Sequence, residues 1–224
     1  MGRLTEVLKQ KGFVIVVSLP RNDKDLAKAA FECGADAIKV HINVEHKASG
    51  TRFGSWSEEK ETILDIIASV DCPVGLMPGA TITPTYYELQ EASDCGVDFI
   101  DIYDYDMPLW MLSLQKIGKM IAVGSNYTLN DVRSLEEIGA DFIEASIVPS
   151  TSYRQPLTVK DLEIYYTMTQ STSKPILVPS QKKLEPADVP LFKEIGIKGL
   201  ILGTISLGDS PQSFRERLPL FING

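Results

Sequence analysis

The stretch 34–43, "GADAIKVHIN", decides the fold class because its two faces have opposite character. Its apolar and polar residues alternate: Ile38, Val40 and Ile42 against Lys39, His41 and Asn43. A parallel strand in an open α/β sheet is buried on both faces and is apolar on both. In a closed barrel, one face meets the helices and the other fills the interior. We therefore expect the apolar set to face the helices, and Lys39, His41 and Asn43 to point into a barrel.

The rest of the chain repeats this strand-and-helix unit. Helical patterns end in Gly34, Gly96, Gly139 and Gly196, each just before a new strand. The strand candidates are "FVIVVS", "DAIKVHI", "PVGLM", "DFIDIY", "MIAVG", "DFIEASI", "PILV" and "GLILG". Eight strands, each followed by a helix, predict a single (β/α)8 TIM barrel over residues 1–224. An extra helix at 2–10 is expected to cover the barrel floor. A doubly wound open sheet is the rival architecture, but eight units in this length favour closure.

The bulk properties exclude several function classes. The 224 residues carry a net charge of −8, which argues against binding to nucleic acid or to an anionic membrane. No apolar run approaches the roughly 18 residues of a membrane span, and the first residues lack the apolar core of a signal peptide. The three cysteines have no metal-binding spacing and fit a reducing cytoplasm. We expect a cytoplasmic protein with no metal and no cofactor, and homo-oligomerisation is plausible for a barrel of this size.

Alternation on two further strands predicts a cluster of charges inside the barrel. In "DFIDIYD" it sends Phe99, Asp101 and Tyr103 inward, and in "DFIEASI" it sends Phe142, Glu144 and Ser146 inward. Alternate strands fill the same interior layer, so Lys39, Asp101 and Glu144 should meet, with His41 and Tyr103 one step higher. A buried lysine beside two carboxylates favours proton transfer, enediol stabilisation or a Schiff base. The alternative is a purely structural group of paired charges.

Two loops at the expected barrel mouth carry further candidates. The long stretch 43–57 lacks a regular pattern and follows the second strand, so it is a candidate lid. The loops after the last two strands predict a phosphate site, because such loops hold phosphate in many barrels. The candidate phosphate-binding residues are Ser180, Gln181, Gly203 and Thr204.

The segment "STSYRQP" at 150–156 resembles the Thr-Ser-Tyr-x-Gln segment of the N-acylglucosamine-6-phosphate 2-epimerases (N-acetylmannosamine-6-phosphate epimerases), which belong to the ribulose-phosphate-binding barrel superfamily. The matching residues are Thr151, Ser152, Tyr153 and Gln155. The resemblance implies that these residues line a sugar-phosphate pocket, in which Asn43 and Tyr103 are further candidates for substrate binding.

The chain departs from that family at its catalytic positions. The family has a lysine ending the third strand and a glutamate ending the seventh, where this chain has "GLMPGA" and "LVPSQ". The resemblance therefore implies a similar pocket but not the same reaction by the same residues. Our first hypothesis is an isomerase, epimerase or aldol-type lyase that acts on a small phosphorylated, sugar-like substrate. Its catalytic residues would be Lys39, His41, Asp101 and Glu144. The alternatives are a non-catalytic barrel that binds a phosphorylated metabolite or a partner protein, and, less favoured, a pyrophosphate-using synthase.

Overall fold

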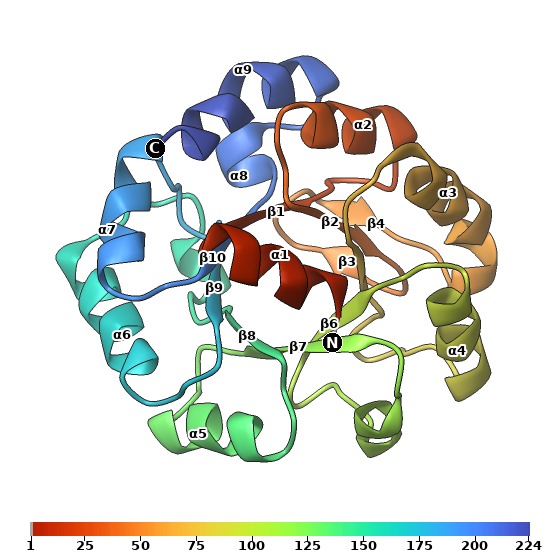
Figure 1. The fold of residues 1–224 in the computed structure, drawn as a ribbon, viewed down its shortest axis with the longest axis horizontal. Coiled ribbons are helices and arrows are strands. Elements are labelled where there is room, and N and C mark those ends of the chain that lie inside the picture. Colours follow the sequence, from red (N-terminus) through yellow and green to blue (C-terminus); the bar gives the residue numbers. More distant parts are fainter. Residues whose placement is uncertain (1) are drawn as a thin grey trace.

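Eight parallel strands close into a barrel in the computed structural model, which describes residues 2–224 (Figure 1). Around the ring the order is β1-β10-β9-β8-β7-β6-β5-β2, and β2 closes on β1. The strands are β1 (Val14–Ser18), β2 (Ala37–His41), β5 (Val74–Met77), β6 (Phe99–Tyr103), β7 (Gly118–Val123), β8 (Phe142–Ala145), β9 (Ile176–Pro179) and β10 (Gly199–Leu202). The predicted (β/α)8 fold is confirmed.

The barrel wall divides the apolar side chains into two clusters, one between the strands and the helices and one inside the ring. Outward strand residues such as Ile38, Val40 and Ile100 pack against the helices. Inward residues from the lower half of the strands, among them Phe99 and Phe142, form a second cluster inside the ring. Gly75 leaves the space that the Phe99 ring fills, because a Cβ at Gly75 would lie 2.2 Å from that ring. The interior is therefore filled by apolar side chains near the N-terminal ends of the strands and carries polar side chains towards their C-terminal ends.

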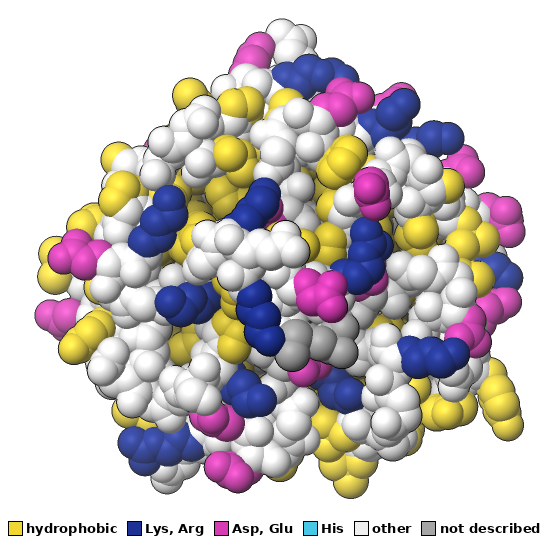
Figure 2. Space-filling model, viewed as in Figure 1, with side chains coloured by type: hydrophobic (Ala, Val, Ile, Leu, Met, Phe, Trp, Pro, Cys, Tyr) yellow, Lys and Arg dark blue, Asp and Glu magenta, His cyan; other side chains and the backbone are white. Residues whose placement is uncertain are grey.

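The first helix covers the floor of the barrel. Helix α1 (Arg3–Lys11) crosses the N-terminal end of the strand ring in Figure 1, and its Leu4 side chain joins the interior cluster. The same face in the space-filling view is closed over the barrel axis and carries mixed acidic and basic side chains (Figure 2). The expected floor helix is confirmed, and the large polar cavity lies at the opposite, C-terminal end of the strands.

Helices surround the ring, with one exception to the expected alternation. They are α2 (Lys24–Glu32), α3 (Trp56–Ser69), α4 (Tyr86–Asp94), α5 (Leu129–Glu137), α6 (Val159–Thr169), α7 (Val189–Glu194), α8 (Thr204–Leu207) and α9 (Pro211–Ile222), with 3-10 turns η1 (Leu109–Ser113), η2 (Ser150–Ser152) and η3 (Pro186–Asp188). Side chains such as Thr85 and Thr128 cap the helix starts. Gly34 and Gly139 end helices with φ of 98° and 99°, where the left-handed conformation favours glycine. Only η1 follows β6, so the prediction of an α-helix after every strand is wrong there.

The stretch 43–57 is more regular than its sequence indicates. It contains an antiparallel hairpin of β3 (Glu45–His46) and β4 (Thr51–Arg52), followed by the start of α3. The Phe53 amide donates to the Val44 carbonyl at 2.8 Å, which continues the pairing beyond the two strands. The segment therefore has a defined shape at the barrel mouth. None of the helices within residues 2–224 is long and apolar enough to cross a membrane.

Candidate functional site

A cavity of about 500 Å³ opens at the C-terminal end of the barrel. Strand ends supply its deep wall, including Ser18, Lys39, Tyr103, Glu144 and Ser146. The hairpin contributes the segment from Val44 to Ala48, and the loops after β9 and β10 contribute Ser180, Gln181, Gly203, Thr204 and Ile205. In a TIM barrel, this is the end at which enzymes of the fold have their active sites. The cavity is therefore the candidate active site.

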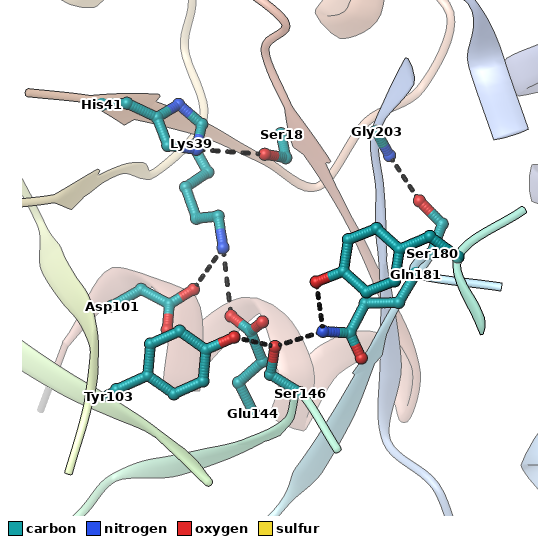
Figure 3. A network of polar contacts seen from close by, with 11 residues as sticks. Ser18, Lys39, His41, Asp101, Tyr103, Glu144, Ser146, Ser180, Gln181 and Gly203 are labelled. Carbon is teal, nitrogen blue, oxygen red and sulfur yellow. Dashed lines mark hydrogen bonds and ion pairs between the residues drawn. The ribbon is translucent and has the colours of Figure 1, made fainter. Parts of the chain in front are cut away.

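Three charged side chains from β2, β6 and β8 meet under this cavity (Figure 3). The Lys39 ammonium donates to Asp101 Oδ2 at 2.6 Å and to Glu144 Oε2 at 3.0 Å. All three residues are buried, with exposed fractions of 7%, 2% and 6% for Lys39, Asp101 and Glu144. The inward positions that alternation predicts are thus occupied as expected. Lys39 and Glu144 line the cavity, whereas Asp101 lies behind them and does not reach it.

Burial and mutual contact drive the two carboxyl groups apart in proton affinity. Burial raises the pKa of Asp101 well above its ordinary value, and the nearby Glu144 carboxylate adds to the rise. Burial would also raise the pKa of Glu144, but the Lys39 charge and hydrogen bonds from Asp101, Lys39 and Ser146 lower it below its usual range. A pair of carboxyls split in this way separates into one acid and one base. From these directions we expect Asp101, rather than Glu144, to be the carboxyl that holds a proton beside a charged Lys39.

The charge on Lys39 bears on the chemistry open to it. Burial alone would lower the pKa of this amine, but its contacts with Asp101 and Glu144 outweigh that effect and raise the pKa above its ordinary value. A Schiff base requires a neutral amine. The arrangement therefore disfavours the Schiff-base option and favours an ammonium that stabilises negative charge. Two of its three N–H bonds are directed at the carboxyls, which leaves one for a bound molecule.

Two histidines lie at the upper end of β2 and in the hairpin. His41 Nε2 lies 3.3 Å from Ser18 Oγ, and its buried Nδ1 has no hydrogen-bond partner within residues 2–224. The His46 ring packs on the His41 ring with centroids 4.8 Å apart, and His46 Nδ1 lies 2.9 Å from Ser49 Oγ. Burial lowers the pKa of His41 well below its ordinary value and lowers the pKa of His46 to about 4; the Lys39 charge lowers both further. Both imidazoles are therefore neutral at neutral pH.

A chain of neutral hydrogen bonds leads from the charged group across the cavity wall. Tyr103 and Ser146 join their hydroxyls at 2.6 Å, and Gln181 Nε2 donates to Ser146 Oγ at 2.7 Å and to Tyr153 Oη at 2.9 Å (Figure 3). Gln181 Oε1 accepts from the Val148 amide at 3.0 Å, which fixes the orientation of the amide group. Tyr105 stacks on Tyr103 with ring centroids 4.9 Å apart. The wall is thus rigid and rich in hydroxyl groups.

The four candidate phosphate residues do lie together. Ser180, Gln181, Gly203 and Thr204 all line the cavity. The Gly203 amide, however, donates to Ser180 Oγ at 2.8 Å and is not available to a ligand. The neighbouring amides of Thr204 and Ile205 start α8 and so have no acceptor within that helix. The adjacent lysines, Lys182 and Lys183, do not line the cavity and form ion pairs of 2.6 Å with Asp161 and Glu185.

Other candidates lie away from the cavity. Asn43 donates to the Pro78 carbonyl at 3.2 Å and has φ of 53°, so the chain leaves the strand there and the alternation no longer applies. In the segment 150–156 only Tyr153 reaches the cavity lining. Thr151 and Gln155 are exposed and Ser152 is half-buried, because the 3-10 turn η2 coils this loop. The expected roles of Asn43, Thr151, Ser152 and Gln155 in the pocket thus lack support from their placement.

Sequence reasoning also missed residues of the site. Ser18 is the last inward residue of β1, and the alternation Val14, Val16, Ser18 was a signal for it. Ser146 was expected to point inward but was not among the candidate site residues. His46 and Tyr105 lie in loops, where no periodic pattern marks an orientation. Within residues 2–224, no three His, Cys, Asp or Glu side chains gather in a way that could hold a metal ion.

Comparison with known proteins supports the fold. No protein-family model and no curated protein matches the chain. Among solved structures, it is similar to thiamine phosphate pyrophosphorylase from Pyrococcus furiosus, with TM-score 0.65 and 16% identity over 96% of both chains. It is also similar to Mycobacterium tuberculosis tryptophan synthase (TM-score 0.73, 13% identity, 99% of this chain and 97% of that chain). A mutant tryptophan synthase alpha-subunit from Pyrococcus furiosus gives TM-score 0.70 at 13% identity over 95% and 98% of the two chains.

These matches cover nearly the whole chain and agree with its (β/α)8 fold. Identities of 13–16% show a shared fold and no shared reaction. None of these similarities bears on the epimerase resemblance. The function must therefore be argued from the site itself.

Proposed function

We propose that the protein is an enzyme that moves a proton next to a carbonyl group in a small phosphorylated, sugar-like substrate. The observation that carries the proposal is the position of Glu144. Its carboxylate lines the cavity, its pKa is lowered by Lys39 despite burial, and Lys39 lies 3.0 Å away with one N–H left over. A base and a positive charge side by side are what removal of a carbon-bound proton needs.

The proposed step has simple roles for the named groups. Glu144 takes the proton from the carbon beside the carbonyl, and the electrons of that C–H bond form a C=C bond while the carbonyl π electrons move to oxygen. The Lys39 ammonium stabilises the negative oxygen. Asp101 lies behind both groups, and its Oδ2 accepts from Lys39 and holds the ammonium in place. His41 supports β2 at the edge of the site through Ser18.

The fate of the enediolate sets the reaction class. Delivery of a proton from solvent to the opposite face of the same carbon gives an epimer. Delivery of a proton to the former carbonyl carbon, with the hydroxyl proton moving from one oxygen to the other, gives an isomer. In an aldol-type cleavage, the same oxyanion and Lys39 pairing stabilises the leaving enolate. The site supports this group of reactions in common, and the products separate them.

The substrate would be bound by the neutral wall and the α8 corner. The Tyr103, Tyr153 and Gln181 side chains offer hydrogen bonds to sugar hydroxyls. Ser180 and Thr204, with the free amides at the start of α8, form the proposed phosphate corner. This corner is built from neutral donors, because the cations lining the cavity are Lys39 and the hairpin residue Lys47.

The test is exchange of substrate hydrogen with solvent. Wild-type protein is incubated in D₂O with triose, pentose and hexose phosphates, including N-acetylmannosamine 6-phosphate, and deuterium uptake beside the carbonyl is followed by NMR. We expect uptake with at least one compound and a loss of about a hundredfold or more in Glu144→Gln. The matched control is Glu137→Gln, an exposed glutamate on α5, which should exchange at the wild-type rate. No uptake with any compound contradicts the proposal.

A non-catalytic barrel is the second candidate, and one observation favours it. Pro179 lines the cavity at the end of β9, where the resembling epimerases have their catalytic glutamate. Thermal shift with the same sugar phosphates separates the two candidates, since a ligand that binds the folded state raises its melting temperature. A shift without any deuterium uptake or conversion favours the binding barrel; a shift with uptake favours the enzyme.

A further inference from the structure

The roof of the cavity carries an imidazole that the proposed reaction does not yet use. His46 belongs to β3 of the hairpin and lines the cavity, whereas Lys39 and Glu144 reach it from the barrel wall. Its Nδ1 lies 2.9 Å from Ser49 Oγ within the same hairpin. When the Ser49 hydroxyl donates to Nδ1, the imidazole proton resides on Nε2. Among the described residues, Nε2 makes no hydrogen bond, so it is free for a bound molecule.

Packing fixes the ring in this place. The His46 ring lies 4.8 Å from the His41 ring and 6.3 Å, edge-on, from the Phe53 ring. Phe53 also packs on His41 at 4.8 Å, so three rings form one contact group between β2 and the hairpin. His41 is fully buried and fixed to β2, which ties the position of His46 to the barrel wall.

The hairpin also reaches across the mouth. Strands β2 and β8 lie on opposite sides of the ring, four places apart in the closed order. The hairpin follows β2, and the loop with Arg154 follows β8. Arg154 Nη2 donates to the Ala48 carbonyl at the hairpin tip at 2.8 Å. This hydrogen bond ties the hairpin to the opposite side of the cavity mouth. It therefore helps to hold His46 above Lys39 and Glu144.

We propose that His46 is a catalytic residue whose Nε2–H donates a hydrogen bond to the substrate oxygen that becomes negative, opposite Glu144, and that Arg154 positions it by latching the hairpin. This inference rests on the proposed function. The imidazole stays neutral throughout: no proton leaves Nε2, and Glu144 holds the proton taken from carbon until that proton returns to carbon or exchanges with solvent. The neutral state suits the role, since burial beside Lys39 lowers the pKa of His46 to about 4. A donor aimed at a developing oxyanion is worth about a hundredfold in rate.

The kinetic test uses the deuterium uptake assay with the compound that exchanges fastest. We expect His46→Ala to lower the uptake rate about a hundredfold. His46→Gln should recover part of that loss, because the amide N–H donates from a similar position. Arg154→Ala should raise KM, and so lower kcat/KM, about tenfold, because the hydrogen bond that holds the hairpin across the mouth is lost. The matched control is Arg52→Ala, an exposed arginine on β4 of the same hairpin, which makes no hydrogen bond across the mouth within residues 2–224. It should leave both constants unchanged.

A second readout needs no substrate. The chain has only two histidines, so its imidazole NMR spectrum has two sets of signals. The groups that face His46 are Lys39, His41 and Glu144. We expect His46 to be the Nε2–H form and to remain neutral down to about pH 4. A His46 that titrates near its ordinary pKa, or that carries its proton on Nδ1, overturns the proposal.

The outcomes separate the two claims. No deuterium uptake by wild-type protein overturns the proposed function and the role of His46 together. Uptake that falls in Glu144→Gln but is unchanged in a folded His46→Ala and His46→Gln overturns the role of His46 alone. Circular dichroism and thermal melting establish that each variant is folded.

Discussion

Lys39 Nζ lies 2.6 Å from Asp101 Oδ2 and 3.0 Å from Glu144 Oε2, yet only one of these two carboxyls faces the cavity. Asp101 is the deeper of the two, and burial together with the Glu144 charge raises its pKa. Glu144 lies at the cavity surface and remains ionised because Lys39 lowers its pKa. One lysine thus contacts a deep carboxyl of raised pKa and a carboxyl of lowered pKa at the cavity surface.

Either carboxyl alone should be able to balance the charge of Lys39, so the loss of one of them should lower the free energy of unfolding only a little. Because the pKa of Asp101 is raised, we expect it to hold a proton, so that Asp101→Asn exchanges one neutral group for another and the free energy of unfolding at pH 7.5 falls by about 1 kcal/mol or less. In Glu144→Gln, Asp101 ionises and pairs with Lys39, which limits the loss to about 1–2 kcal/mol. The double variant leaves Lys39 buried without an anion and should lose about 3–5 kcal/mol. Urea unfolding of all four proteins measures this; additive losses contradict the coupling.

Removal of the lysine should make stability depend on pH in a new way. Lys39→Met leaves two buried carboxyls without a cation, which raises the pKa of both above their unfolded values. Groups of raised pKa stabilise the fold below the unfolded pKa and lose that effect as the pH rises. We therefore expect a loss of about 3–5 kcal/mol at pH 7.5 that shrinks towards pH 4. A loss that is equal at both pH values contradicts the buried contact.

For His46 we expect the opposite pH dependence: the stability that this residue contributes should fall as the pH falls. Its pKa falls from an ordinary 6.5 to about 4 in the folded protein, so the unfolded chain takes up a proton first as the pH drops. The stability it contributes is full above pH 6.5 and is lost as the pH falls towards 4. Between pH 7.5 and pH 5, wild type should lose about 2 kcal/mol more than His46→Gln. Equal pH profiles for the two proteins would place His46 in solvent.

Gln181 should contribute to both stability and substrate binding, because its side chain makes hydrogen bonds to three groups in the cavity wall. Its side chain donates to Ser146 and Tyr153 and accepts from the Val148 amide. Gln181→Met keeps the size but leaves these partners unsatisfied, so we expect a loss of about 1–3 kcal/mol in the free energy of unfolding. The KM for the exchanging sugar phosphate should rise as Tyr153 loses its partner. A control at Gln212, an exposed glutamine on α9, should change neither quantity when replaced by Met.

The barrel and its charged interior were predictable from the sequence because strand geometry is regular. Side chains alternate along a strand, so Lys39, Asp101 and Glu144 were placed inside by their apolar neighbours alone. The floor helix followed from an amphipathic pattern, and Leu4 indeed enters the interior cluster. Closure of the ring then required the inward side chains of β2, β6 and β8 to converge.

The loops were less predictable because their conformation depends on single residues. The positive φ of Asn43 turns the chain into the hairpin, and nothing in the alternation of β2 announces that turn. Arg154, with φ of 67°, similarly shapes the loop 150–156, so that Tyr153 faces the cavity while Thr151 and Gln155 do not. A motif match therefore located the loop but not the direction of its side chains. After β6, the chain forms the short η1 where a helix was expected.

The split between Asp101 and Glu144 is the central claim, and carbon-13 NMR of the two carboxyl groups tests it most directly. The signals are assigned with Asp101→Asn and Glu144→Gln and followed from pH 3 to pH 9. Our account predicts that at pH 7 the Asp101 signal is that of a carboxylic acid and the Glu144 signal that of a carboxylate. Two carboxylates at pH 7, or a Glu144 that titrates at a higher pH than Asp101, would contradict it.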